Sequence, residues 1–244
     1  MADSLLLTLP CPADLTEIDD ALRMLADADY RRFQSGLLPG INPARVLGVR
    51  MPVLRRYARA IAGTPAAAAF LADLPHASYD ADNLHACLLS MMDNRAALIC
   101  ALDAFLPHID NWATCDMLRP PLLGRDLPAL RRDAARWMAD PHPYTCRFGI
   151  EMLMVHGLGK FSADDPAAVA EIAWARGDEY YVAMMCAWYF ATALAAAHDA
   201  IWPYFAEPLL PPAVRQMARR KAYDSRRISP ADKAALRAIP ANFC

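Results

Sequence analysis

The sequence predicts an all-α protein, and three observations support that prediction. Apolar residues recur at three- and four-residue steps, as they do on one face of a helix. The segments break at glycine or at the 20 prolines, most of which lie between the predicted helices. No segment of alternating β-branched residues competes with this pattern. Predicted helix pairs recur at about 35–40 residues, which favours a right-handed α-solenoid of HEAT-like (ARM-like) pairs; an irregular helical bundle is the alternative.

The helices follow one another after a loose N-terminal leader, residues 1–13. Apolar spacing begins at Asp14, and we expect one helix that continues to Phe33 before the breaks at Gly36 and Gly40. Proline or glycine then marks the end of nearly every later segment. The later helices are expected at residues 52–61, 66–74, 82–92, 95–105, 111 to about 120, 128–138, 144–156, 166–174, 178–197, 214–223 and 230–238.

Length and composition favour one folded domain over residues 1–244. Hydrophobic residues make up 56% of the chain and charged residues 21%, so a sizeable core is expected and disorder is not. The formal net charge of −2 argues against a protein that coats nucleic acid by bulk charge, although a local basic face remains open. No composition shift marks a domain boundary.

The cysteines and the apolar runs indicate the cellular compartment in which we expect the protein. The seven cysteines are odd in number and form no CxxC motif, so we expect free, mostly buried thiols in a reducing cytoplasm. The N-terminus lacks the basic region of a signal peptide. No apolar run reaches the roughly 18 residues that a membrane span needs, so we expect no membrane association.

Common catalytic and cofactor motifs are missing from the sequence. The six histidines form no HxxxH or HExxH arrangement, so no metal site is expected. There is no GxSxG elbow for Ser-His-Asp catalysis and no glycine-rich phosphate loop, so no cofactor is expected either. A lone histidine on a helix, such as His85, is more often structural than catalytic.

The stretch from His108 to Arg119 is the most informative part of the sequence. We expect Asp110 to cap a helix that starts at about Asn111. Trp112 and Asp116 are four residues apart, so they share one face of that helix. An aromatic face beside a carboxylate can hold a cationic ring. The alternative is a core tryptophan beside a solvated or capping aspartate.

Three further features carry polar chemistry. Arg147 is a charged residue in an apolar helix, where an ion pair with Glu151 is the plain alternative. Trp188 stands in an apolar segment, where a core role is the alternative. A basic segment near the C-terminus has six basic residues against one acid and is either a solvated helix or a phosphate-contacting face. Its basic residues are Arg215, Arg219, Arg220, Lys221, Arg226 and Arg227.

From about Tyr30 to Arg237 the sequence resembles the AlkD-type DNA alkylation repair proteins, whose fold is a solenoid of HEAT-like helix pairs. Singly the matching motifs are weak, but their order and spacing are fairly specific. They are Gly48-Val49-Arg50-Met51-Pro52, Asp110-Asn111-Trp112-Ala113-Thr114-Cys115-Asp116, Tyr144-Thr145-Cys146-Arg147-Phe148-Gly149, Glu179-Tyr180-Tyr181-Val182 with Ala187-Trp188, and Ser225-Arg226-Arg227-Ile228-Ser229.

The resemblance implies excision of cationic N3- or N7-alkylated purines from double-stranded DNA, without a flipped-base pocket. We expect the protein to be a monomer. Trp112, Asp116, Arg147 and Trp188 match the family's site positions. In those positions Asp116 would stabilise an oxocarbenium-like sugar, the two tryptophans would cradle the sugar and backbone, and Arg147 would hold a phosphate. Two alternatives stay open: a non-catalytic HEAT-like module that binds DNA or protein on its concave face, and a structural scaffold.

Overall fold

The computed structural model describes residues 12–239, and their regular structure is helical. An isolated antiparallel bridge joins Ala26 to Val49. The all-α prediction is therefore confirmed. Two compact units divide the chain, one ending at Leu122 and the other beginning at Leu123. The single domain, the HEAT-like pairing and the right-handed sense stay predictions. Within the described residues no helix combines the length and the apolar character that crossing a membrane requires.

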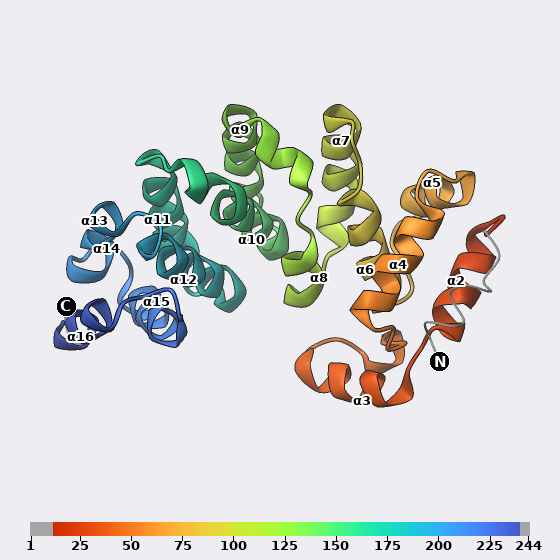
Figure 1. Ribbon diagram of the computed structural model, residues 1–244, viewed down its shortest axis with the longest axis horizontal. Coiled ribbons are helices and arrows are strands. Elements are labelled where there is room, and N and C mark those ends of the chain that lie inside the picture. The colour runs from red at the N-terminus through yellow and green to blue at the C-terminus, as the bar shows by residue number, and fades with distance from the viewer. Residues whose placement is uncertain (1–11, 240–244) are drawn as a thin grey trace. The chain divides into compact units, whose positions relative to one another are not determined.

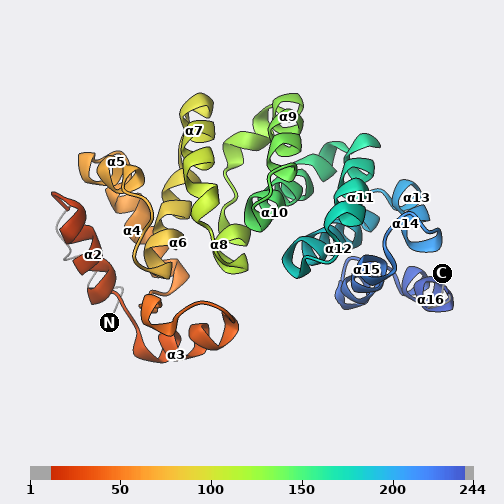
Figure 2. The same cartoon turned by 180° about the vertical axis from the view of Figure 1, so that it is seen from behind.

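The first unit is built around one helix, α6, all of whose residues are buried. This helix contacts α2, α4, α5, α7 and α8, and Figures 1 and 2 both show α4, α6 and α8 following one another. The elements of the unit are α2 (Leu15–Met24), α3 (Ala28–Leu37), η1 (Pro43–Arg45), α4 (Met51–Ile61), α5 (Pro65–Ala72), α6 (Tyr79–Leu89), α7 (Arg95–Phe105), η2 (Leu106–His108) and α8 (Trp112–Met117); η3 (Pro121–Arg125) leads out of it.

The single helix expected from Asp14 to Phe33 is wrong, because the chain breaks between α2 and α3. Ala26 leaves the helix to pair with Val49. The Asp27 side chain then caps α3 by accepting a hydrogen bond from the Tyr30 amide at 2.9 Å. An aspartate can serve equally as an N-cap or as an exposed helix residue, so the apolar spacing alone did not reveal the break.

The second unit is centred on α12, which packs against α10, α11 and α15. Its fully buried side chains include Met185, Tyr189 and Phe190, and they form the middle of the core. The elements of the unit are α9 (Leu127–Met138), α10 (Pro143–Met152), η4 (Leu153–Gly157), η5 (Leu158–Lys160), α11 (Asp164–Arg176), α12 (Tyr180–Leu194), α13 (His198–Ile201), α14 (Pro203–Ala206), α15 (Pro212–Asp224) and α16 (Pro230–Ala238).

The helix expected over residues 144–156 changes type before its end. The α-helical part stops at Met152, and a π-helical turn, Leu153–Gly157, follows it. The short helices α13 and α14 had no counterpart in the prediction, because four-residue helices are too short to show a period.

The described cysteines are free thiols, as expected from their spacing. Cys87, Cys115, Cys146 and Cys186 are buried, and Cys100 is exposed. Burial raises the pKa of the Cys87 and Cys146 thiols to about 11 in each case. These buried thiols are therefore protonated near neutral pH and act as small apolar groups.

Candidate functional site

The short helix α8 presents Trp112 and Asp116 one turn apart, and both side chains are half-buried. Its N-cap is Asn111, whose side-chain oxygen accepts a hydrogen bond from the Thr114 amide at 2.8 Å. The Thr114 hydroxyl donates in turn to the side chain of Asn83 on α6 at 2.9 Å. These bonds tie the first turn of α8 to the centre of the unit, so the direction of the Trp112 and Asp116 face is set by α6.

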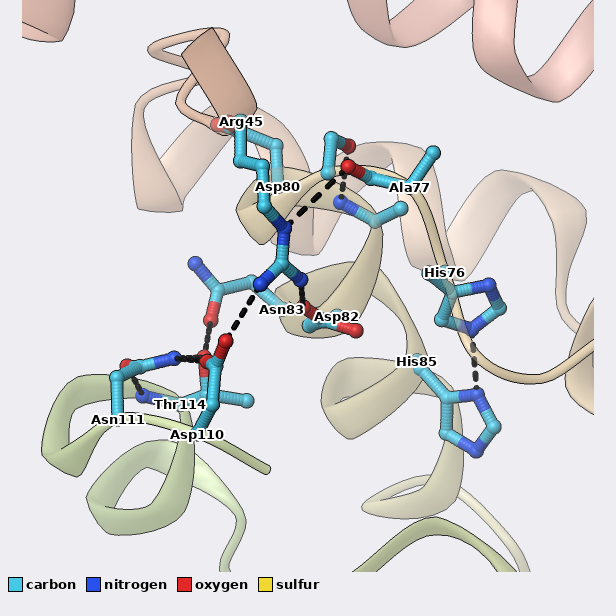
Figure 3. A network of polar contacts seen from close by, with 12 residues as sticks. Arg45, His76, Ala77, Asp80, Asp82, Asn83, His85, Asp110, Asn111 and Thr114 are labelled. Atoms are coloured by element: carbon cyan, nitrogen blue, oxygen red, sulfur yellow. Dashed lines mark hydrogen bonds and ion pairs between the residues drawn. The ribbon is translucent and has the colours of Figure 1, made fainter. Parts of the chain in front are cut away.

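The prediction that Asp110 caps this helix is wrong, because Asn111 takes the capping position. The Asp110 carboxylate instead pairs with the Arg45 guanidinium and accepts a hydrogen bond from the Asn111 amide group at 3.0 Å. Arg45 also pairs with Asp82 of α6 at 3.0 Å and donates to the Ala77 carbonyl at 3.4 Å, as Figure 3 shows. One guanidinium therefore joins the segment before α4, the segment at α6 and the loop that enters α8.

Asp82 is the buried partner in this arrangement, with 3% of its surface exposed. Burial raises the pKa of its carboxyl, the Arg45 guanidinium opposes the rise, and the carboxylates of Asp110 and Asp80 add to it. A partly buried ion pair of this kind adds little net stability but holds its partners in one geometry. Arg45 thus acts on the position of α8 more than on the overall free energy of unfolding.

A second buried carboxylate, Asp80, fixes the chain just ahead of α4. It accepts hydrogen bonds from the backbone amides of Leu47 at 2.6 Å, Gly48 at 3.2 Å and Val49 at 2.7 Å. Gly48 has φ of 94°, and a Cβ there would approach the Asp27 carbonyl oxygen to 2.6 Å. The motif that begins at Gly48 therefore has a structural reason within the first unit.

The Trp112 ring rests on a small apolar cluster formed mainly by the segment between α3 and α4. The cluster consists of Leu38, Ile41, Val46 and Tyr79. Because Trp112 is only half-buried, part of the indole stays at the surface. The tryptophan is therefore supported from one side and accessible from another.

Arg147 lies on α10 in the second unit, with 4% of its surface exposed. Its Nη1 donates a hydrogen bond at 2.7 Å to the carbonyl of Tyr181, in the first turn of α12. On the same helix a Cβ at Gly149 would lie 2.9 Å from the Ala134 carbonyl oxygen, so the glycine allows α9 and α10 to approach closely. Arg147 thus sits at the junction of α10 and α12.

Trp188, on α12, lines a cavity of about 320 Å³ between α12 and α15. The Lys221 ammonium lies 5.5 Å from the centroid of its ring, a cation–π arrangement. Met185 on the same helix is fully buried, whereas Trp188 is half-buried. The cavity is lined by Trp188, Ala191, Thr192, Lys221, Asp224 and Ser225.

The basic segment divides into guanidinium groups that brace the fold and groups that face solvent. Arg215 is 4% exposed and donates to the Glu207 carbonyl at 3.1 Å. Arg219 donates to the carbonyls of Leu236 at 2.6 Å and Ile239 at 2.9 Å. These contacts tie α15 to its neighbours. The exposed members of the segment are Arg220, Arg226 and Arg227.

The four candidate residues belong to different units. Trp112 and Asp116 stand together on α8 in the first unit, and Arg147 and Trp188 occupy α10 and α12 of the second. We expect the four side chains to converge on one groove, and this expectation stays a prediction.

The sequence analysis missed two basic features of the first unit. Arg45 makes its ion pairs with residues 37 and 65 positions away, so no local pattern could have marked it. Arg55 and Arg59 line a pocket with Arg119. Their four-residue spacing on α4 could have predicted a basic helix face.

A comparison with family models matches residues 18–176 to the family described as DNA alkylation repair enzyme. The match covers more than half of the 244 residues and ends where α11 ends. Trp112, Asp116 and Arg147 lie inside the matched region, and Trp188 lies beyond it. No curated protein and no solved structure matches the sequence.

Proposed function

The chain belongs to the DNA alkylation repair enzyme family, and from that premise we propose that it is a DNA N-glycosylase. Its substrates would be cationic N3- or N7-alkylated purines in double-stranded DNA. The observation that carries the proposal is the pair on α8, where Trp112 and Asp116 stand one turn apart, half-exposed, on a helix anchored at its cap. The AlkD-type resemblance drawn from the motifs agrees with the family match.

The chemistry of the lesion suits such a pair. Alkylation at N3 or N7 gives the purine a positive charge, so the base departs as a neutral molecule when it takes the electrons of the C1′–N bond. Positive charge then develops on the deoxyribose, and the Asp116 carboxylate would stabilise it. Water adds to C1′ and gives up a proton, which leaves an abasic site and the free base. This hydrolysis, as written, uses water and requires no cofactor.

The remaining site residues would position the nucleotide. Trp112 offers a partly exposed ring with an apolar backing, and Trp188 offers one beside a cavity and the Lys221 ammonium. Both suit contact with a sugar and the backbone that carries it. Arg147, whose Nη1 donates to the Tyr181 carbonyl, would bind a phosphate through the same planar guanidinium group. Arg220, Arg226 and Arg227, exposed near α15, would add phosphate contacts.

The test is single-turnover release of 7-methylguanine and 3-methyladenine from methylated duplex DNA. Asp116→Asn keeps the shape of the side chain and removes its charge, so DNA binding should persist while release slows about 10²–10³-fold. Asp19→Asn, an exposed position on α2 of the same unit, is the matched control and should release both bases at the wild-type rate.

Two results would change the proposal. Equal release by the wild type and Asp116→Asn would remove the electrostatic role of the carboxylate. No release by the wild type, with duplex DNA still bound, would favour the non-catalytic DNA-binding module instead.

A further inference from the structure

A basic pocket lies in the first unit, next to the helix that carries Asp116. Its volume is about 280 Å³, and it spans α4, the C-terminal end of α6 and the residues at the end of α8. Its lining combines three arginines with thiol, hydroxyl and apolar groups. The lining residues are Arg55, Arg59, Cys87, Ser90, Met91, Met117, Arg119 and Pro121.

Two arginines of α4, Arg55 and Arg59, have no acidic partner in the part of the chain that the structure describes. Within residues 12–239 no carboxylate lies within ion-pair distance of Arg55 or Arg59, whereas Arg50 at the start of the same helix pairs with Asp27 at 2.9 Å. Arg55 and Arg59 are exposed and one turn apart, so their guanidinium groups share one face of α4. Like charges at this spacing repel each other, and an anion between them would relieve that repulsion.

The other lining groups keep the pocket positive. None of the lining residues is acidic. Burial raises the pKa of the Cys87 thiol to about 11, with Arg55 and Arg59 opposing the rise, so this lining thiol carries no negative charge near neutral pH. Three arginines therefore line a pocket whose other residues are uncharged and partly apolar, with Met91 and Met117 among them.

We infer that this pocket binds a backbone phosphodiester of the DNA strand that passes the α8 site. This inference rests on the proposed function, because it takes the ligand to be duplex DNA. Guanidinium groups form paired hydrogen bonds with phosphate oxygens. The methionines offer an apolar surface to the adjoining deoxyribose, which a free inorganic anion would not need. Met117 directly follows Asp116, so a strand held here would run beside the carboxylate.

The experiment measures binding to an unmodified duplex of about 20 base pairs by fluorescence anisotropy, over a range of salt concentration that spans about fourfold. The double variant Arg55→Ala/Arg59→Ala should bind about tenfold or more weakly and reduce the slope of log K against log salt by about 1, because one phosphate contact is lost. The variant Arg55→Lys/Arg59→Lys keeps the charge and should retain most of the slope. Arg56→Ala, on the same helix but outside the pocket lining, is the matched control and should bind like the wild type.

The outcomes separate this inference from the proposed function. If the wild type releases no base but the double alanine variant loses the salt slope, the pocket stands and the glycosylase proposal fails. If the wild type releases the bases and the double alanine variant keeps the wild-type salt slope, the pocket inference fails and the glycosylase proposal stands. An equal loss in Arg56→Ala would mean a diffuse charge effect and would overturn the pocket. The pocket inference would also be overturned if the wild type did not bind the duplex. A third contrary result would be an acidic peptide that competes for the protein better than unlabelled DNA does.

Discussion

The buried histidine pair of the first unit should make the protein acid-sensitive in a specific way. His76 and His85 share a hydrogen bond of 2.8 Å between ring nitrogens, and Phe70 and Phe105 stack on their outer faces. They are 8% and 1% exposed. Burial lowers the pKa of His76 to about 4, opposed by Asp73, and that of His85 to about 3.

The size of the effect follows from these pKa values. A histidine whose pKa is lowered in the folded state contributes stability that is present above pH 6.5 and is lost as the pH falls. At pH 5 the unfolded chain binds protons at both positions and the folded chain at neither. At pH 5 each histidine therefore lowers the free energy of unfolding by about 2 kcal/mol relative to high pH, and the pair lowers it by about 4 kcal/mol. This figure holds because both pKa values lie a full unit or more below 5.

Other groups titrate with the opposite sign. Burial raises the pKa of Asp80 and of Asp82, and hydrogen bonding to Asp199 raises that of His198, so their contributions grow as the pH falls. The comparison must therefore be made against a variant that keeps these groups. The variant His76→Leu/His85→Leu removes the histidine pair and leaves Asp80, Asp82 and His198 in place.

The assay is urea unfolding followed by circular dichroism at pH 7 and pH 5. The free energy of unfolding of the wild type should fall by about 4 kcal/mol more than that of the double variant between the two pH values. His108→Leu removes an exposed histidine of the same unit whose charge is only a smaller cause of both lowered pKa values, so it should keep most of the pH-dependent change of the wild type. The same pH-dependent change in the wild type and the double variant would refute the reasoning, whatever the stability of either protein at pH 7.

Further changes test other parts of the structure. Asp80→Ala should lower the free energy of unfolding by about 3 kcal/mol or more in urea, because it leaves the backbone amides at 47–49 without an acceptor. Gly149→Ala should lower it by about 1–2 kcal/mol, since the added Cβ meets the Ala134 carbonyl at 2.9 Å; an unchanged melting temperature would contradict the close approach. Arg45→Met should slow base release in single turnover while leaving the far-ultraviolet spectrum unchanged, and an unaltered rate would show that α8 keeps its position without the guanidinium. Lys221→Met should reduce the salt slope of DNA binding by about 1, measured by anisotropy.

Much of the fold could be predicted because helix signals are local. The apolar period and the prolines and glycines between segments were enough to predict the helical class, and most of the predicted ranges overlap helices of the structure. The shared helix face of Trp112 and Asp116 could also be predicted, since residues four apart on a helix lie on one face whatever the rest of the chain does. Errors arose where two local readings were equally good. Asp110 and Asn111 are both good caps, and only the packing against Asn83 selects the second.

The sequence by itself determined that the chain is helical, that Trp112 and Asp116 share a helical face, and that the motifs resemble a DNA alkylation repair family. Only the tertiary structure decided which polar groups support that face, and that Arg55 and Arg59 have no acidic partner within the described residues. Arg45 reaches Asp82 and Asp110 across 37 and 65 residues of sequence, and Cys87 of α6 and Arg119 beyond α8 complete the pocket begun by Arg55. The physical reason is one of range: a helical turn brings together residues three or four apart, whereas contacts between helices depend on packing that no local period encodes.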